Sequence, residues 1–223
     1  MKKGFLLLIY CFSFLYADAR VDGLKQRVCN SLSSLEGWCT SEKALNFIDL
    51  ILEVKPDIYV EIGVFGGRSL LPVASALKFL NHGVVYAIDP WDRFEATRYY
   101  DPIHDRTNLE WWDKLNFNYI YSSYLAMLRK YDLERYCITL KMTSEKAVSE
   151  IDRIDILHID GNHSEEGSII DVVLYLPKVR SGGYIWMNDA SWADRQEAVD
   201  VLAKECDVIK ILDNGNLVLF RKR

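Results

Sequence analysis

The spacing of apolar residues predicts strands and helices in alternation from Ser41 onward. A helix begins near Ser41, because Ala44, Phe47, Ile48, Ile51 and Leu52 fall on one face at helical spacing. Short apolar runs predict five strands, at Ile58 to Ile62, Val84 to Ile88, Cys137 to Leu140, Ile154 to Ile159 and Gly183 to Met187. Further helical patterns cover Leu70 to Leu80, the stretch after Thr143 or Ser144, Ser164 to Leu176, and Ser191 to Ala203. Val208 to Leu212 and Leu217 to Phe220 flank an Asp-Asn-Gly-Asn turn, which is typical of a hairpin.

This order of elements predicts an α/β fold. Strands that alternate with helices form a parallel sheet with helices on both faces and right-handed connections. We expect a Rossmann-like, doubly wound sheet of about seven strands, mostly parallel, that closes with a C-terminal antiparallel hairpin. The chain shows no internal repeat and no low-complexity linker, so residues 20–223 are predicted to form one domain.

Two segments depart from the regular pattern. Residues 20–38 are a weakly patterned lead-in. Residues 91–136 lose regular patterning and are rich in aromatic residues, which is more than a solvent-exposed loop needs. These side chains either stack on a substrate as a cover or form a small helical subdomain buried against the sheet. The residues concerned are Tyr99, Tyr100, His104, Trp111, Trp112, Tyr119 and Tyr121.

The N-terminus has the features of a secretory signal peptide over residues 1–19. Lys2 and Lys3 precede an apolar run of about thirteen residues, and Ala17-Asp18-Ala19 has the form of a cleavage site. A membrane span needs roughly twenty apolar residues, so no stable span is expected after cleavage. The protein would then be exported, to the periplasm or outside the cell. The alternative is an apolar helix packed on a cytoplasmic or membrane-associated protein.

Composition and charge exclude some classes of function. A net charge of -5 provides no basic field, and no stretch combines dense Lys and Arg with aromatics, so nucleic acid is not an expected partner. Cleavage after Ala19 would leave Cys29, Cys39, Cys137 and Cys206. Export makes a disulfide between the nearby Cys29 and Cys39 plausible, although the sequence does not assign the pairing. A small-molecule substrate and a possible homo-oligomer are compatible with this composition.

Side-chain oxygens follow four of the predicted strands. Glu61 ends the first strand before the glycine turn Gly63-Val64-Phe65-Gly66-Gly67, Asp89 ends the second, Asp160 ends the fourth, and Asn188-Asp189 end the fifth. Ligands of doubly wound sheets bind beyond these carboxyl ends. The glycine spacing fits neither a dinucleotide fingerprint nor a phosphate-binding loop. Asp89 nevertheless follows the turn at about the distance at which an acid binds ribose hydroxyls, which favours a nucleoside-bearing ligand.

Three motifs resemble class I S-adenosylmethionine-dependent methyltransferases, in the branch of macrocin-type and other sugar O-methyltransferases. They are Glu61-Ile62-Gly63-Val64-Phe65-Gly66-Gly67, Ala87-Ile88-Asp89-Pro90-Trp91 and His158-Ile159-Asp160-Gly161-Asn162-His163. The resemblance runs from about Ser41 to the C-terminus and includes the terminal hairpin. Phe65 stands where many members have glycine.

The resemblance implies a binding site for S-adenosyl-L-methionine. Gly63, with Gly66 and Gly67, would face the methionine part of the cofactor, Glu61 would lie beneath them, and Asp89 would hold the ribose. The adenine contact would come from Met142 to Ser144. Trp91 would either wall the site or cap the core.

A second cluster would carry the chemistry. Asp160, Asn188 and Asp189 offer oxygen ligands of the kind that Mg²⁺ prefers, and such a metal can lower the pKa of a substrate hydroxyl. The resemblance implies this metal set, although Asn188 in place of an acid reduces its charge. His163 is the candidate catalytic base, or else a histidine that only satisfies local hydrogen bonds before Ser164. His158 is expected in the core.

These features predict an enzyme that methylates an oxygen of a small sugar or phenolic substrate, with assistance from a divalent metal. Two alternatives remain. One is an exported, non-catalytic binding module that keeps the fold, because the cofactor is made in the cytosol. The other is a nicotinamide-dependent oxidoreductase, which the poor dinucleotide fingerprint weakens.

Overall fold

The computed structural model describes residues 19–223. The predicted leader therefore lies outside the described residues except for Ala19, and both the leader and the export that depends on it stay predictions. Among residues 19–223, no helix has the length and apolar character needed to cross a membrane.

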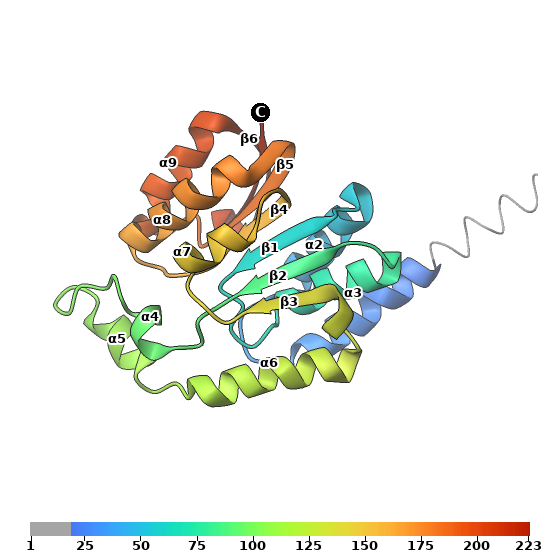
Figure 1. Ribbon diagram of the computed structural model, residues 1–223, viewed down its shortest axis with the longest axis horizontal. Coiled ribbons are helices and arrows are strands. Elements are labelled where there is room, and N and C mark those ends of the chain that lie inside the picture. The colour runs from blue at the N-terminus through green and yellow to red at the C-terminus, as the bar shows by residue number, and fades with distance from the viewer. Residues whose placement is uncertain (1–18) are drawn as a thin grey trace, which may run out of the picture.

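A seven-stranded sheet forms the centre of the molecule (Figure 1). Its order is β3-β2-β1-β4-β5-β7-β6, and the first five strands in this order are parallel, whereas β7 runs antiparallel to both of its neighbours. The predicted fold class is therefore confirmed. The strands are β1 (Ile58–Ile62), β2 (Val84–Ile88), β3 (Cys137–Leu140), β4 (Ile154–Ile159), β5 (Val179–Asn188), β6 (Cys206–Leu212) and β7 (Leu217–Lys222).

Helices bury an apolar core on each face of the sheet. One core combines side chains of α2 (Ser41–Val54), α3 (Leu70–Leu80) and α6 (Phe117–Tyr131) with a helix that covers residues 19–32. The other core is formed with α7 (Ser144–Ala147), α8 (Glu165–Tyr175) and α9 (Gln196–Glu205). The order of the strands reverses between β1 and β4, which is where ligands bind in sheets of this kind.

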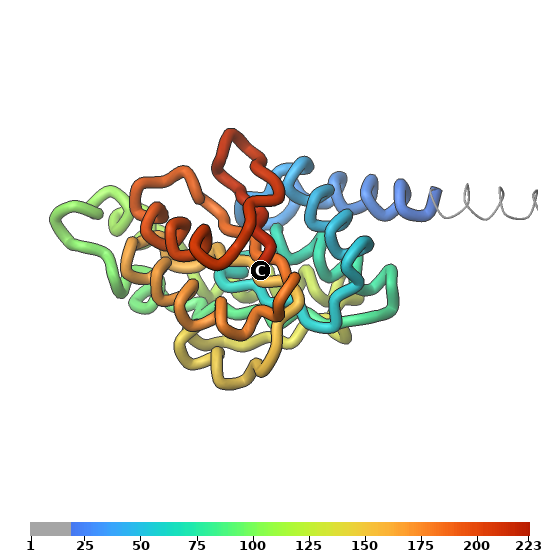
Figure 2. The backbone as a smooth tube through the Cα atoms, turned by 90° about the horizontal axis from the view of Figure 1, so that it is seen from above, coloured from blue at the N-terminus to red at the C-terminus, as the bar shows by residue number. Residues whose placement is uncertain are grey.

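The remaining helices are short and lie between the larger elements. They are α4 (Arg93–Ala96) and α5 (Arg106–Trp112), with the 3₁₀ turns η1 (Glu134–Tyr136), η2 (Val148–Glu150), η3 (Leu176–Lys178), η4 (Ala193–Arg195) and η5 (Asp213–Gly215). The segment with α4 and α5 projects at the end of the molecule opposite the helix of residues 19–32 (Figure 2).

Several boundaries differ from the sequence predictions. The lead-in of residues 20–38 is largely helical, and residues 91–136 contain α4, α5 and the 15-residue helix α6. Tyr124 and Met127 are buried on α6, yet Asn, Ser and Tyr interrupt the apolar pattern that would have revealed it. The strand β5 is longer than expected, and α9 begins after Ser191 because η4 comes first.

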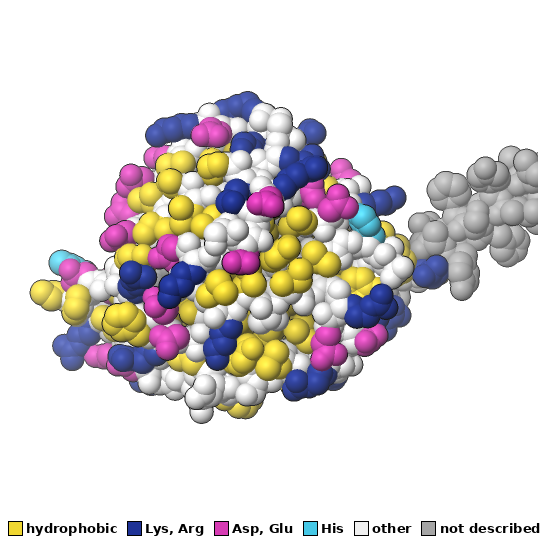
Figure 3. Space-filling model, in the orientation of Figure 1, with side chains coloured by type: hydrophobic (Ala, Val, Ile, Leu, Met, Phe, Trp, Pro, Cys, Tyr) yellow, Lys and Arg dark blue, Asp and Glu magenta, His cyan; other side chains and the backbone are white. Residues whose placement is uncertain are grey.

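Charges and thiols are unremarkable outside the site. Basic and acidic side chains are interspersed over the face shown in Figure 3. Cys29, Cys39, Cys137 and Cys206 are free thiols, so the disulfide considered between Cys29 and Cys39 is absent from the described residues. Cys39 is buried, and its burial raises the pKa of the thiol to about 12, which makes it a poor nucleophile.

Candidate active site

A cavity opens beyond the carboxyl ends of β1, β2 and β4, where the strand order reverses. The turn after each of these strands contributes to its wall, and the segment with α4 closes one side. The lining includes Gly63, Val64, Phe65, Arg68, Ser69, Asp89, Trp91, Arg98, Tyr99, Ser144, Glu145, Asp160, Asn162, His163 and Asp171. The wall thus collects side chains from five separate parts of the chain.

Gly63 is required by the packing of two strand ends against each other. Its φ is +87°, and a Cβ added there would lie 2.0 Å from the main-chain oxygen of Asp160. An L-amino acid with a side chain therefore fits neither the backbone conformation nor the space. The turn also brings the main chain of Val64 and Phe65 to the cavity wall.

Gly66 and Gly67 approach protein atoms and do not line the cavity. A Cβ on Gly66 would lie 2.4 Å from Cβ of Glu36, and one on Gly67 would lie 2.4 Å from Cε of Met127. These two glycines let the segment before α2 and the helix α6 pack closely on the turn. Their predicted contact with a cofactor stays a prediction.

Asp89 joins the turns after β1 and β2. One carboxylate oxygen accepts a hydrogen bond from the Phe65 amide at 2.9 Å, and the other accepts one from the Trp91 amide at 2.7 Å. Burial raises the pKa of this carboxyl group to about 6, although the amide hydrogen bonds act in the opposite direction. The group is therefore ionised at neutral pH, and each oxygen has a lone pair left for a ligand hydroxyl.

The sequence left open whether Trp91 walls the site or caps the core, and in the structure it does both. It lines the cavity, yet it is only 4% exposed and stacks on Tyr124 with ring centroids 5.0 Å apart. Its indole Nε1 donates to the main-chain oxygen of Phe65 at 2.7 Å. The residue therefore fixes the β1 turn from the core side while it forms part of the wall.

Glu61 lies under the turn and is fully buried. The hydroxyl of Ser69, at the start of α3, donates to one of its oxygens, while the other oxygen has no hydrogen-bond partner. Glu61 does not line the cavity, whereas Ser69 and Arg68 do. Nη1 of Arg68 donates to the main-chain oxygen of Gly37, and no carboxylate of residues 19–223 lies within 4.0 Å of this guanidinium.

Polar side chains also cluster at the far end of the cavity, near the turn after β3. Ser144 donates to Asp171, and the hydroxyl of Tyr99 donates to Glu145 at 2.6 Å. Burial raises the pKa of Asp171 to about 7, against the effect of the Ser144 hydrogen bond. Tyr99 brings the aromatic segment of residues 91–136 into this wall, and Trp112 of that segment also lines the cavity.

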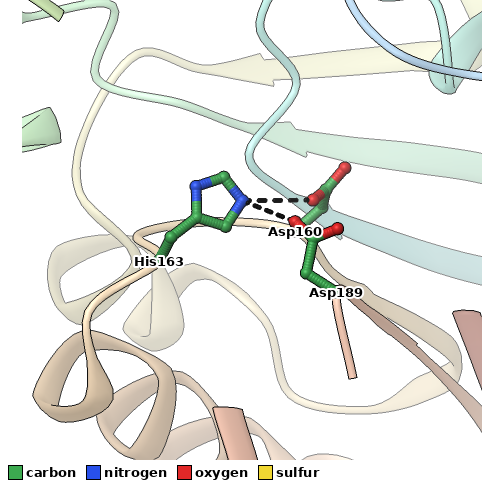
Figure 4. Close-up of side chains that lie close together, drawn as sticks. All are labelled: Asp160, His163 and Asp189. Carbon is green, nitrogen blue, oxygen red and sulfur yellow. Dashed lines mark ion pairs between the residues drawn. The ribbon is translucent and has the colours of Figure 1, made fainter. Parts of the chain in front are cut away.

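Asp160, His163 and Asp189 converge at the carboxyl ends of β4 and β5 (Figure 4). Nε2 of His163 lies 2.9 Å from a carboxylate oxygen of Asp189 and 3.8 Å from one of Asp160. Burial lowers the pKa of His163, but the two carboxylates outweigh it and raise that pKa above 6.5. The other ring nitrogen, Nδ1, points away from both acids (Figure 4).

Asn188 is oriented differently from the way a metal ligand would be. Its Oδ1 accepts a hydrogen bond from Nζ of Lys43 at 3.1 Å, and its Nδ2 donates to Asp160 at 2.8 Å. The only side-chain oxygen of Asn188 is thus directed at a lysine and not at the acids. Among the carboxylates, imidazoles and thiols of residues 19–223, Asp160, His163 and Asp189 are close enough together to hold a metal ion.

Four residues of this site were missed or undervalued by the sequence reasoning: Arg68, Ser69, Lys43 and Arg195. Lys43 precedes Phe47 by four positions and so lies on the apolar face of α2, whereas Arg195 is the last residue of η4 and precedes the buried Ala198 of α9 by three positions. A charge on an apolar face was the available signal. Arg68 and Ser69 immediately precede the helix predicted at Leu70 to Leu80.

Comparison with known proteins identifies the family. A family model described as a methyltransferase domain matches residues 60–190, which is more than half of the 223-residue chain. No curated protein matches the chain significantly in sequence.

Solved structures show the same fold at low sequence identity. The O-methyltransferase NovP is 20% identical, with 82% of this chain and 80% of that chain covered and a TM-score of 0.64. The methyltransferase PaMTH1 of Podospora anserina, bound to S-adenosylhomocysteine, is 11% identical over 95% of both chains, with a TM-score of 0.60. A putative O-methyltransferase from Klebsiella pneumoniae is 12% identical over 90% of both chains, with a TM-score of 0.60. The chain therefore belongs to the methyltransferase-domain family, and it is a class I S-adenosylmethionine-dependent methyltransferase, as its three motifs predicted.

Proposed function

We propose that this enzyme transfers the methyl group of S-adenosylmethionine to an oxygen atom of a small hydroxylated acceptor, either a sugar or a phenol. The observation that carries the proposal is the pair His163 and Asp189, in which His163 lines the same cavity as Gly63 and Asp89. A histidine next to a carboxylate at the wall of a cavity can take the proton of a hydroxyl group bound there. The O-methyltransferases among the structural neighbours support the same choice of acceptor atom.

The cavity walls fit the parts of the cofactor. Asp89 offers ionised oxygens to ribose hydroxyls, and the polar turn around Ser144 lies at the adenine end. Arg68 is a cavity-lining guanidinium without an acidic partner among the described residues, and it would bind the cofactor carboxylate in a bidentate manner. The neighbouring Ser69 begins α3, whose N-terminal amides favour the same negative charge.

His163 would act as the base. Its Nε2 faces Asp189, so Nδ1 is the atom left to take the proton of the acceptor hydroxyl. As the acceptor oxygen forms its bond to the methyl carbon, the carbon–sulfur bond of the cofactor breaks and the hydroxyl proton passes to Nδ1. Asp189 stabilises the imidazolium that results, and placement of the acceptor in line supplies much of the rate.

The predicted role of Mg²⁺ rests on ligands that do not all fit. The side-chain oxygen of Asn188 already accepts a hydrogen bond from the ammonium of Lys43, and a metal ion bound to that oxygen would lie next to this positive charge. Asp160, Asp189 and His163 have ligand atoms within 4.8 Å of one another, but a cation bound there would occupy Nε2 of His163 and change its role. We therefore derive no step through a metal.

The acceptor would lie between His163 and the exposed ring of Trp192. Trp192 packs on the His163 ring with centroids 5.4 Å apart and is still 46% exposed, so it offers an open face for stacking. An exposed indole beside a base suits a flat phenol or the apolar face of a sugar ring. Both remain within the proposed acceptor class.

The first test is a calorimetric titration of S-adenosylhomocysteine into the full chain and into the Asp89→Ala variant. We expect binding that weakens by about 100-fold in the variant, because two charge-assisted hydrogen bonds to the ribose disappear. The matched control is Asp132→Ala, which removes an exposed carboxylate far from the cavity and should not change the affinity. Folding of each variant is checked by circular dichroism.

Absence of binding to the folded natural chain would refute the proposal and favour a non-catalytic module that retains the fold. Once binding is established, radiolabelled cofactor and panels of phenols and sugars identify the acceptor. Methyl transfer to nitrogen or sulfur acceptors alone would contradict O-methylation while leaving the cofactor site intact.

A further inference from the structure

A buried lysine ties three parts of the chain together next to the acids. Lys43 of α2 is 6% exposed, and its Nζ donates to Oδ1 of Asn188 at 3.1 Å and forms an ion pair with Asp213 at 3.2 Å. Asn188 ends β5, and Asp213 begins the turn between β6 and β7. A buried ammonium must be paired in this way, because an unpaired one is very costly.

The chemistry of its partners fixes the orientation of Asn188. A lysine ammonium only donates hydrogen bonds and an ionised carboxylate only accepts them, so the amide oxygen must face Lys43 and the NH₂ must face Asp160. Turning the amide over would place donor against donor and acceptor against acceptor. The amide of Asn188 thereby links the ammonium of Lys43 to the carboxylate of Asp160 by two hydrogen bonds.

A second cation lies behind the same acids. Arg195 is fully buried, and its Nη1 donates to the Ser168 hydroxyl at 2.7 Å. No carboxylate of residues 19–223 lies within 4.0 Å of it, and its Nη2 donates to the main-chain oxygen of Gly161, next to Asp160, at 3.5 Å. Burial lowers the pKa of Arg195, whereas the charges of Asp160, Asp189 and Asp171 act in the opposite direction. An arginine stays protonated even when buried, so this charge is permanent.

The acids at the ends of β4 and β5 therefore already face positive charge from the protein. We propose that Lys43, through Asn188, and Arg195 supply the positive charge that a divalent metal would otherwise supply to Asp160 and Asp189, so that the site works without a metal. This inference rests on the proposed function. It assigns Lys43 and Arg195 as positioning residues and leaves His163 unligated for proton transfer.

The test measures binding of Mn²⁺, a spectroscopic probe of Mg²⁺ sites, to the full chain by electron paramagnetic resonance. We expect the natural chain to leave the signal of free Mn²⁺ unchanged. In the Lys43→Gln/Asn188→Asp variant, which removes one positive charge and adds a third carboxylate, Mn²⁺ should bind at least about tenfold more tightly, because affinity rises with the number of charged ligands. Lys43→Arg keeps the charge and should show no gain.

Binding of one Mn²⁺ by the natural chain, abolished by Asp160→Asn, would overturn the proposal. Failure of the folded double variant to gain affinity would also overturn it, because protein charge would then not be what excludes the metal. Lys43→Gln alone, which retains a donor for Asn188, gives the same test if the double variant does not fold. Binding of S-adenosylhomocysteine is measured on the same samples, so loss of the cofactor site is distinguished from a wrong assignment of the cations.

Discussion

The turns after β1 and β2 are held by hydrogen bonds from main-chain amides to one carboxylate, whereas the carboxyl ends of β4 and β5 are linked by contacts between side chains. In the first region, amides of Phe65 and Trp91 bind Asp89, and Gly63 packs directly on a main-chain oxygen. In the second region, Lys43, Asn188 and Asp160 form one chain of contacts, and His163 and Asp189 form another. The first region depends on the backbone conformation that Gly63 allows, and the second depends on which side chains the fold brings together.

This difference separates the two tasks of the enzyme. A rigid turn built from amides suits the recognition of a cofactor that stays the same in every reaction of the family. A cluster of side chains can be changed one residue at a time, which suits the acceptor and its proton. The following variants test this contrast.

The largest effect is expected from Gly63→Ala. The new Cβ would meet the main-chain oxygen of Asp160 and the residue would keep a φ of +87°, so we expect a loss of about 4 kcal/mol in the free energy of unfolding. Gly215→Ala is the matched control, because its φ is +94° but its nearest neighbour would lie 3.8 Å away, and backbone strain alone should cost about 1 kcal/mol. Urea denaturation measures both. Equal losses would show that the strand ends are not closely packed.

A smaller effect is expected on the pKa of His163 when the variant Asp189→Asn removes the neighbouring carboxylate. Burial lowers the pKa of His163, and the carboxylates of Asp160 and Asp189 outweigh burial and raise it, so removal of one of these charges should lower it. Nuclear magnetic resonance of the imidazole C–H protons follows this directly. The methylation rate of the natural enzyme should rise with pH above 6.5, as the base form appears, and an unchanged pKa in the variant would contradict the pairing.

A comparable effect is expected when Arg68→Gln removes the proposed contact to the cofactor carboxylate. S-adenosylhomocysteine should bind about tenfold more weakly, while methylthioadenosine, which lacks that carboxylate, should bind as before. Arg98→Gln is the control, since Arg98 also lines the cavity but faces Glu95 and Glu145. Equal losses for both ligands would mean that Arg68 only shapes the turn through Gly37.

The smallest effect is a pH dependence of cofactor binding. Burial raises the pKa of Asp89 to about 6, so the carboxylate that we propose accepts ribose hydroxyls is progressively lost below pH 6. Affinity for S-adenosylhomocysteine should be constant above pH 7 and fall up to about tenfold between pH 6 and pH 5, as expected for one group. Calorimetry across this range, with Asp89→Asn as a pH-independent control, tests it. An affinity that increases as the pH falls would exclude Asp89 as the acceptor.

Much of the fold could be read from local patterns. The bounds predicted for β1, β2, β3 and β4 agree with the structure, because these buried strands are short apolar runs between turn residues. The helix α6 was missed because it buries aromatic residues among polar ones, and the helix of residues 19–32 because its apolar stripe is sparse. Tertiary packing stabilises both helices more than their intrinsic propensity does.

The candidate site also has residues that the sequence predicted and contacts that it did not. Asp89, Asp160 and His163 were predicted from the rule that ligands bind beyond strand ends, and all three line the cavity. The pairing of Asn188 with Lys43 could not be predicted, because the two residues are 145 positions apart and sequence does not show which partner an amide oxygen takes.

By itself, the sequence determined the class of the protein, the order of its elements and the strand ends at which chemistry would occur. Those properties follow from hydrophobic period and from residues that are neighbours along the chain. Only the tertiary structure decided that Gly66 and Gly67 pack against Glu36 and Met127, that Lys43 contacts Asn188 and Asp213, and that Arg195 is buried near the acids of β4 and β5. These outcomes depend on distances between segments far apart in sequence, where burial and charge are shared by side chains that only folding brings together.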